Sequence, residues 1–157
     1  MINETGASRD LDAYSRRCHP ACIACRDRDQ GGMELRFKTG EDGSVTADFP
    51  CDPNYQSYPD RLHGGVVAML LDAAMTHCLF ARKLHGVTAR MSIRYHHPAE
   101  IGSHATIRAH LVRSIHNLYV LEAEMIQEGI VRASAEARFL SLPEQKGWAE
   151  DSFSKPL

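Results

Sequence analysis

The sequence predicts an α+β fold in which one antiparallel sheet of about six strands wraps around one long central helix. The first observation is the order of the elements, which is two strand-like runs, one long apolar segment and four more strand-like runs joined by short turns. The second is that the long segment is apolar on nearly all sides, so a helix formed there must be covered on most of its surface. A sheet curled around a single helix meets both conditions, and this architecture is the hotdog fold.

The first two strands are predicted from alternation of apolar and polar residues. "GMELRFK" places Met33, Leu35 and Phe37 on one face, and "SVTADF" alternates in the same way from Val45 to Phe49. The turn sequence "TGEDG" lies between them, so the two strands are expected to form a hairpin. The following segment, "PCDPNYQSYPD", is rich in proline and is expected to be a loop.

The long helix is expected from about His63 to Leu84, closed by Gly86. Four strands should follow, in "VTARMSIRYHHP", "SHATIRAHLVR", "NLYVLEAEMIQ" and "IVRASAEARFLSL". In the first of these four, simple alternation places Thr88 and Arg90 on one face and Tyr95 on the other.

Length and composition favour a single domain with two polar extensions. We expect an N-terminal arm with a short helix over residues 1–30, a hotdog domain over 31–143 and a polar tail over 144–157. The net charge of -2 argues against nucleic acid as a partner. The longest apolar run, Val66 to Leu71, is too short to cross a membrane. The N-terminus lacks the apolar core of a secretory signal, and an odd number of cysteines favours reduced thiols, so the cytoplasm is the expected location.

Asp72 is the residue that does not fit the apolar helix around it. A carboxylate in an apolar setting costs several kcal/mol unless it is paired, hydrogen-bonded or neutralised. At 100° per residue, a stripe of small and polar residues contains Gly65, Ala68, Asp72 and Thr76. Asp72 can therefore face a cleft instead of the core. The plainer alternative is an ion pair of Asp72 with His77 or an arginine.

The sequence "HGG" at the helix start indicates a second half of the same site. Glycines there leave the free backbone N–H groups open to close approach, and these groups favour negative charge. They can stabilise the oxyanion of acyl transfer, although glycines that only permit tight helix packing are the alternative. Gly64 and Asp72 are about 12 Å apart along one helix, so one carbonyl carbon cannot touch both. Two antiparallel helices in a two-fold dimer would bring the start of one helix to Asp72 of the other.

The pattern "HGGVVAMLLDAAM" followed by "TARMSIRYHHPAEIG" resembles the hotdog acyl-CoA thioesterases of the phenylacetate-pathway (PaaI-like) group. The resemblance extends from about Met33 to Leu142. It implies hydrolysis of a small or medium acyl- or aryl-CoA, with no cofactor because CoA is part of the substrate. It also implies that the amide of Gly64 or Gly65 polarises the thioester carbonyl. Asp72 from the partner subunit would be the nucleophile or the general base.

The same resemblance assigns further positions. His63 would shape the turn and contact the thioester, and Thr88 would position water. Other positions are implied for binding the substrate: Gln56 and Ser57 before the helix, Tyr95 and Pro98 along the pantetheine path, and Arg90 and Arg113 for the CoA phosphates. The expected assembly is a homodimer with composite sites, or a dimer of dimers.

Other functions remain open at this stage. A hotdog hydratase or dehydratase would need a histidine and an acid placed for proton transfer at carbon. A non-catalytic acyl-CoA binding protein is a further alternative. Cys18, Cys22 and Cys25 are candidate zinc ligands, with His19 or Cys51 as a fourth, but the paired C-x-x-C spacing of a zinc site is absent and plain thiols are favoured.

Overall fold

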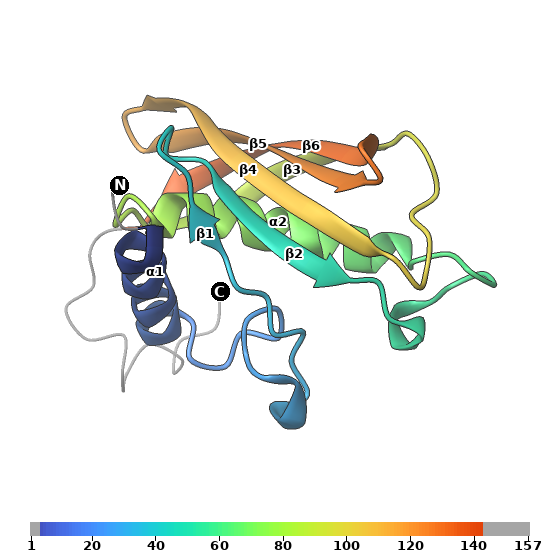
Figure 1. The fold of residues 1–157 in the computed structure, drawn as a ribbon. Helices are drawn as coiled ribbons and strands as arrows, with labels where there is room; N and C mark the ends of the chain where they lie inside the picture. The colour runs from blue at the N-terminus through green and yellow to red at the C-terminus, as the bar shows by residue number, and fades with distance from the viewer. Residues whose placement is uncertain (1–3, 143–157) are drawn as a thin grey trace, which may run out of the picture.

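The computed structural model describes residues 4–142 and confirms the predicted class, with one six-stranded antiparallel sheet curled against a long helix (Figure 1). The strand order is β1-β2-β4-β5-β6-β3. The predicted tail at 144–157 lies outside the described residues. The elements, in chain order, are α1 Glu4–Cys18, β1 Lys38–Thr39, β2 Val45–Pro50, α2 Gly64–Phe80, β3 Gly86–Tyr95, β4 His104–Ile115, β5 Leu118–Gln127 and β6 Ile130–Ser141, with short 3-10 helices at Arg28–Gln30 and Pro53–Tyr55.

Helix α2 forms the centre of the core on the inner face of the sheet. It begins at Gly64, as predicted within one residue, and its C-terminal half from Ala73 to Phe80 is buried throughout. It ends four residues before the predicted Leu84. The amides of Lys83 and Leu84 donate to Phe80 and Leu79, and Lys83 adopts a left-handed backbone conformation that stops the helix. Gly86 therefore opens β3 and does not close the helix. In residues 4–142, no helix is both long and apolar enough to cross a membrane.

The predicted N-terminal hairpin is present but much shorter than expected. Met33, Leu35 and Phe37 are buried, as their alternation predicts. However, the amides of Met33 and Leu35 donate to the carbonyls of Ile23 and Ala24, each at 2.9 Å. The backbone of residues 33–35 is thus paired with the N-terminal arm, and only two residues remain for β1.

The N-terminal arm contains a helix of 15 residues, α1, longer than the short helix predicted. Leu11 and Ser15 are buried on the side of α1 that faces the core. The Tyr14 ring packs edge-on against Phe80 at the end of α2, with ring centroids 5.8 Å apart. Figure 1 shows α1 beside β1 and that end of α2. The arm is therefore part of the folded domain.

Strand β3 lies at one edge of the sheet, and its alternation is interrupted near its start. Thr88 pairs with Phe139 and Arg90 pairs with Arg138, so Ala89 is an extra residue in a β-bulge. Paired residues share a face, and Phe139 is fully buried beneath α2. Thr88 therefore faces the helix, whereas Arg90 faces away from it. The prediction that these two residues share a face is wrong, because alternation alone cannot register a bulge.

Candidate active site

The Asp72 carboxylate is held by a hydroxyl from the neighbouring edge strand. Thr88 Oγ1 donates a hydrogen bond of 2.7 Å to Asp72 Oδ1. Asp72 is half-buried and Thr88 is exposed, so this pair lies at the molecular surface and not in the core. Within residues 4–142 Asp72 makes no ion pair, and His77 is bonded elsewhere. The alternative pairing of Asp72 with His77 or an arginine is therefore wrong.

The stripe predicted on α2 is the part of this helix that the sheet leaves open. Gly65 is exposed, and Ala68, Met69 and Asp72 are each partly exposed, one helical turn after another. Thr76 closes the stripe because its side chain is buried. The small side chains leave Asp72 accessible to a molecule lying along α2.

The start of α2 distinguishes between the two candidate amides. His63 caps the helix, and its Nδ1 accepts a hydrogen bond of 2.9 Å from the Gly65 amide. The Gly65 donor is therefore occupied. The Gly64 amide makes no hydrogen bond within residues 4–142, and Tyr95 Oη donates to the Gly64 carbonyl at 2.8 Å. Gly64 is the amide of this pair that remains available to an oxyanion.

A cavity of about 260 Å³ lies beside the helix start and brings several predicted residues together. Gly64 lines it together with Tyr95 and Pro98, the two residues predicted for the pantetheine path. The cavity also contains a residue that the sequence reasoning missed, Arg132. In the pairing of β5 with β6, Met125 faces Ala133 and Ile126 faces Val131, so Arg132 is the extra residue of a second bulge.

Arg132 is a buried cation with incomplete hydrogen bonding. Its Nη1 donates to the Pro98 carbonyl at 3.2 Å, and the Glu100 carboxylate lies 3.8 Å away. Its Nε has no partner among the described residues. The sequence offered one weak signal, an arginine directly between Val131 and Ala133 in an otherwise apolar stretch. Only the bulge turns this side chain inward.

Gln56 and Ser57 do not converge on the cavity. Both are exposed in the loop before α2. The Gln56 side-chain oxygen accepts a hydrogen bond of 3.0 Å from the Asp60 backbone amide. The Gln56 side chain therefore stabilises the loop itself.

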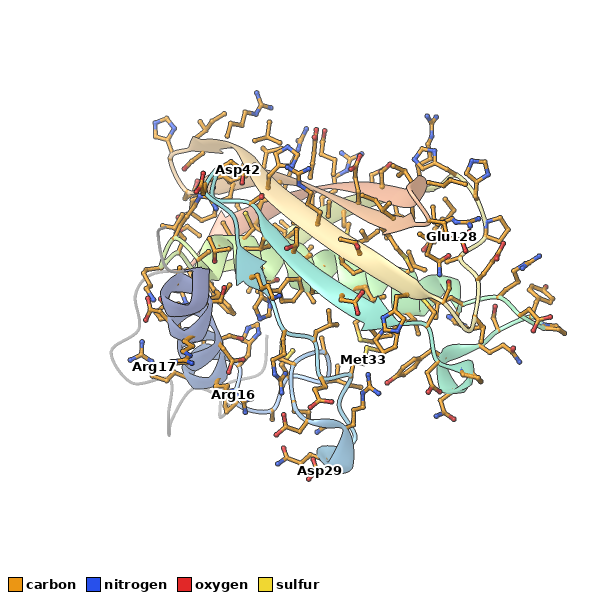
Figure 2. All side chains as sticks on the ribbon, viewed as in Figure 1. Arg16, Arg17, Asp29, Met33, Asp42 and Glu128 are labelled. Carbon is orange, nitrogen blue, oxygen red and sulfur yellow. The ribbon has the colours of Figure 1, made fainter. Side chains whose placement is uncertain are left out.

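Arg90 and Arg113 lie on the outer face of the sheet, away from α2. Arg90 pairs with Arg138, Arg138 with Val120, and Val120 with Arg113, which places the three arginines in one row across four strands. Arg90 and Arg138 line a groove of about 1000 Å³ that also contains acidic residues, among them Asp42. Figure 2 shows side chains projecting from this outer face, with Asp42 at its edge. These arginines do not approach Asp72 of their own chain.

The cysteines of the arm do not form the zinc site that was the less favoured alternative to plain thiols. In the part of the chain that the structure describes, no three histidine, cysteine, aspartate or glutamate side chains are grouped to hold a metal ion. Cys18, Cys22 and Cys25 are free thiols in the arm, and Cys51 and Cys78 are buried in the core. His77, a further potential ligand, is buried, and this burial lowers its pKa to about 4.

One known family matches the segment that contains the candidate site. The family model described as "Thioesterase superfamily" matches residues 60–134, which include the helix start, Asp72, Thr88 and Arg132. A comparison with curated proteins gives no match.

Solved structures similar to this chain share its fold at low sequence identity. The E. coli PaaI protein from the phenylacetic acid degradation operon has 14% identity and a TM-score of 0.72, covering 88% of this chain and 97% of its own. Thioesterase superfamily member 2 from Mus musculus has 20% identity and a TM-score of 0.70, covering 87% and 98%. A hypothetical thioesterase from Streptococcus pneumoniae TIGR4, solved with coenzyme A, has 22% identity and a TM-score of 0.65, covering 69% and 85%.

Residues 60–134 thus match the thioesterase superfamily model, and the solved structures share the fold of this chain. The PaaI protein, from the group that the pattern from His63 to Asp72 resembles, is among these structures of similar fold.

Proposed function

We propose that the protein is an acyl-CoA thioesterase that hydrolyses a small or medium acyl- or aryl-CoA. The observation that carries this proposal is the Asp72–Thr88 hydrogen bond of 2.7 Å on the open stripe of α2. This hydrogen bond orients a carboxylate at the surface of a fold that solved thioesterases share. The S. pneumoniae relative solved with coenzyme A supports CoA as the carrier of the acyl group.

In the proposed reaction, the Gly64 amide polarises the thioester carbonyl and stabilises the oxyanion that forms on its oxygen. Asp72 either takes a proton from an attacking water or attacks the carbonyl carbon itself to form a mixed anhydride, which water then hydrolyses. In both routes the C–S bond breaks, CoA leaves as a thiolate that gains a proton, and the acyl group is released as a carboxylic acid. The Thr88 hydroxyl orients Asp72, and no cofactor takes part.

The two halves of this site come from different subunits. Within one chain, Gly64 and Asp72 are eight residues apart on α2, or about 12 Å along its axis. The open stripe on α2 and the exposed edge strand β3 are adjacent, and Val87 and Tyr95 on β3 are each about half exposed. A second copy running antiparallel would cover both surfaces and bring its Gly64 to Asp72. We therefore propose a homodimer in the cytoplasm, alone or paired into a tetramer.

Two other functions are separated from hydrolysis by their products. A hotdog hydratase would add water to an enoyl-CoA and leave the thioester intact, whereas a binding protein would release nothing. His96 and His97 line the cavity at the helix start, but Asp72 is bonded to Thr88 and not to an imidazole. This arrangement favours hydrolysis, because proton transfer at carbon needs an acid–base pair directed at the α- and β-carbons.

The test is steady-state turnover of a panel of acyl- and aryl-CoAs, with release of free CoA thiol followed by a thiol reagent. Loss of the enoyl absorbance of an unsaturated CoA is followed in parallel. Thiol release with at least one substrate, unaffected by a metal chelator, is expected. Consumption of enoyl-CoA without thiol release would establish the hydratase, and tight binding without either reaction would establish the binding protein.

A further inference from the structure

Two thiols and an imidazole meet away from the candidate active site, where the N-terminal arm packs on the buried half of α2 (Figure 1). Cys22 and Cys25 have C-x-x-C spacing. The amides of Cys25 and Arg26 both donate to the Cys22 carbonyl, at 3.1 and 2.9 Å, so the segment forms one helical turn. Residues three apart in such a turn have Cβ atoms about 5–6 Å apart. A small adjustment of this turn brings them to the separation of about 3.5–4.5 Å that a disulfide requires.

The Cys25 thiol is buried against His77. Cys25 Sγ lies 3.4 Å from His77 Nε2. His77 Nδ1 must donate to the Ala73 carbonyl, 2.8 Å away, because a carbonyl only accepts, so Nε2 of the neutral ring is an acceptor. The Ser15 hydroxyl lies 2.8 Å from Nε2 and can fill this acceptor. The Cys25 thiol hydrogen is then available to Cys22.

The pKa of the Cys22 thiol is shifted in the opposite direction from the pKa of the other four thiols. The hydrogen bond between the two thiols lowers the pKa of Cys22 and raises that of Cys25, and His19 lowers the pKa of Cys22 further. Burial raises the pKa of the three remaining cysteines, Cys18, Cys51 and Cys78. Cys22 is also partly exposed, whereas Cys25 is buried. A partly exposed thiolate beside a buried thiol is the arrangement of an attacking and a resolving cysteine.

We propose that Cys22 and Cys25 form a reactive dithiol that a hydroperoxide converts into an intramolecular disulfide. The Cys22 thiolate attacks the peroxide oxygen, the O–O bond breaks, and a sulfenic acid forms on Cys22 while hydroxide or alkoxide leaves. Cys25 Sγ then attacks the Cys22 sulfur, the S–O bond breaks, and the leaving hydroxyl takes the Cys25 proton as water. The two thiols lose two electrons in total, and the peroxide is reduced to water, or to an alcohol and water. This modification site is separate from Gly64, Asp72 and Thr88.

The experiment uses the reduced full-length protein and hydrogen peroxide as the probe. Samples are quenched with an alkylating reagent, and fragmentation mass spectrometry assigns the linkage, because one tryptic peptide carries Cys18, Cys22 and Cys25. We expect a mass loss of about 2 Da from a Cys22–Cys25 disulfide. Oxidation of Cys22 should be at least about tenfold faster than that of Cys51 or Cys78.

Three variants complete the design. Cys25→Ser should stop at a sulfenic acid on Cys22 that a cyclic dione traps, and Cys22→Ser should lose the rapid reaction. Cys18→Ser is the matched control and should form the disulfide at the rate of the unmodified protein. The rate of alkylation of Cys22 in the unmodified protein is a check that needs no variant, and it should stay high below pH 7. Three results would each overturn the proposal. They are rapid oxidation of the Cys22→Ser variant, a disulfide that involves Cys18, and oxidation of Cys22 that is no faster than that of Cys51.

Discussion

Asp72 is set apart from the other carboxylates of the described residues by its place on an apolar helix. It is half-buried, lies on the open stripe of α2 and accepts the Thr88 hydroxyl at 2.7 Å. Several surface acids, by contrast, are paired with arginine, lysine or histidine, as Asp48 is with His104. A carboxylate with a single hydroxyl partner keeps its remaining lone pairs for a substrate or a water.

Replacing Asp72 with asparagine should therefore remove activity while keeping the fold. The side chain stays nearly the same size and can still accept a hydrogen bond from Thr88, but it can neither take a proton nor attack a carbonyl. We expect kcat to fall at least about a hundredfold, the usual scale for loss of a base or nucleophile. Turnover of the best acyl-CoA is measured, with circular dichroism and sedimentation as controls. A variant that keeps most of its kcat would show that Asp72 is not the reacting carboxylate.

His77 makes the stability of the domain dependent on pH. Burial lowers its pKa to about 4 from 6.5, so the folded protein holds it neutral where the unfolded chain binds a proton. The stability that depends on a neutral His77 is fully present above pH 6.5. It is lost as the pH falls toward about 4, below which His77 is protonated in both the folded and the unfolded state. The change amounts to about 3 kcal/mol of unfolding free energy.

Urea unfolding between pH 7.5 and 4 measures this effect. The free energy of unfolding should decrease over that interval in the unmodified protein. His77→Gln, whose amide does not titrate, should be less stable at pH 7 and should show a flatter profile. Parallel profiles for the two proteins would mean that other groups cause the acid dependence.

Among the elements, α2 and β3 show most clearly how the sequence determines the site. The His63 cap and the adjacent glycines fix where α2 begins, and both are local signals. The element order and the helix start were therefore predictable from the sequence. Other features depend on contacts with residues that are distant in the sequence. These are the bulges at Ala89 and Arg132 and the pairing of residues 33–35 with the arm. For this reason, alternation misplaced Thr88 and did not identify Arg132.

Gly64→Pro tests the helix start as an oxyanion donor. Proline at the first position of a helix is well tolerated, and His63 has the extended backbone that a following proline favours. The substitution therefore removes the Gly64 N–H with little other change. Gly64→Ala is the matched control, because it keeps the amide and its Cβ would meet the Tyr95 ring at an ordinary 3.6 Å.

We expect Gly64→Pro to lower kcat by about a hundredfold or more, the scale for loss of an oxyanion donor, and Gly64→Ala to lower it far less. Thermal unfolding confirms that both variants fold. Equal losses in the two variants would mean that crowding, and not the amide, is responsible.

The bulge in β3 turns Thr88 toward Asp72, and two substitutions test separately the hydroxyl and the shape of the Thr88 side chain. Thr88→Val keeps the branched shape and removes the donor to Asp72, whereas Thr88→Ser keeps the donor. A hydrogen bond to a charged group contributes about 1.5–3 kcal/mol, so Thr88→Val should lower kcat/KM by about tenfold or more. Thr88→Ser should stay close to the unmodified enzyme. Similar values of kcat/KM for the valine and serine variants would exclude Thr88 as the group that orients Asp72.

At the scale of the whole molecule, the proposed mechanism needs two chains, because one chain contains both halves of the site but cannot use them together. The sheet buries one side of α2 and leaves the stripe around Asp72 open, while β3 ends the strand order with an exposed edge. The distance of about 12 Å between Gly64 and Asp72 on one helix exceeds the reach of one thioester carbonyl. The central claim is therefore that a working site combines Gly64 of one subunit with Asp72 and Thr88 of the other.

Complementation between two inactive variants tests this claim most directly. Gly64→Pro and Asp72→Asn are each purified, shown by sedimentation to be dimers or larger, and mixed under conditions in which subunits exchange. In a mixed dimer, one site carries both substitutions and the other carries neither. With random pairing about half of the dimers are mixed, so turnover should recover to about a quarter of the unmodified value. Mixed dimers that form, as shown by differently tagged subunits, yet recover no turnover would contradict the account, because each site would then lie within one chain.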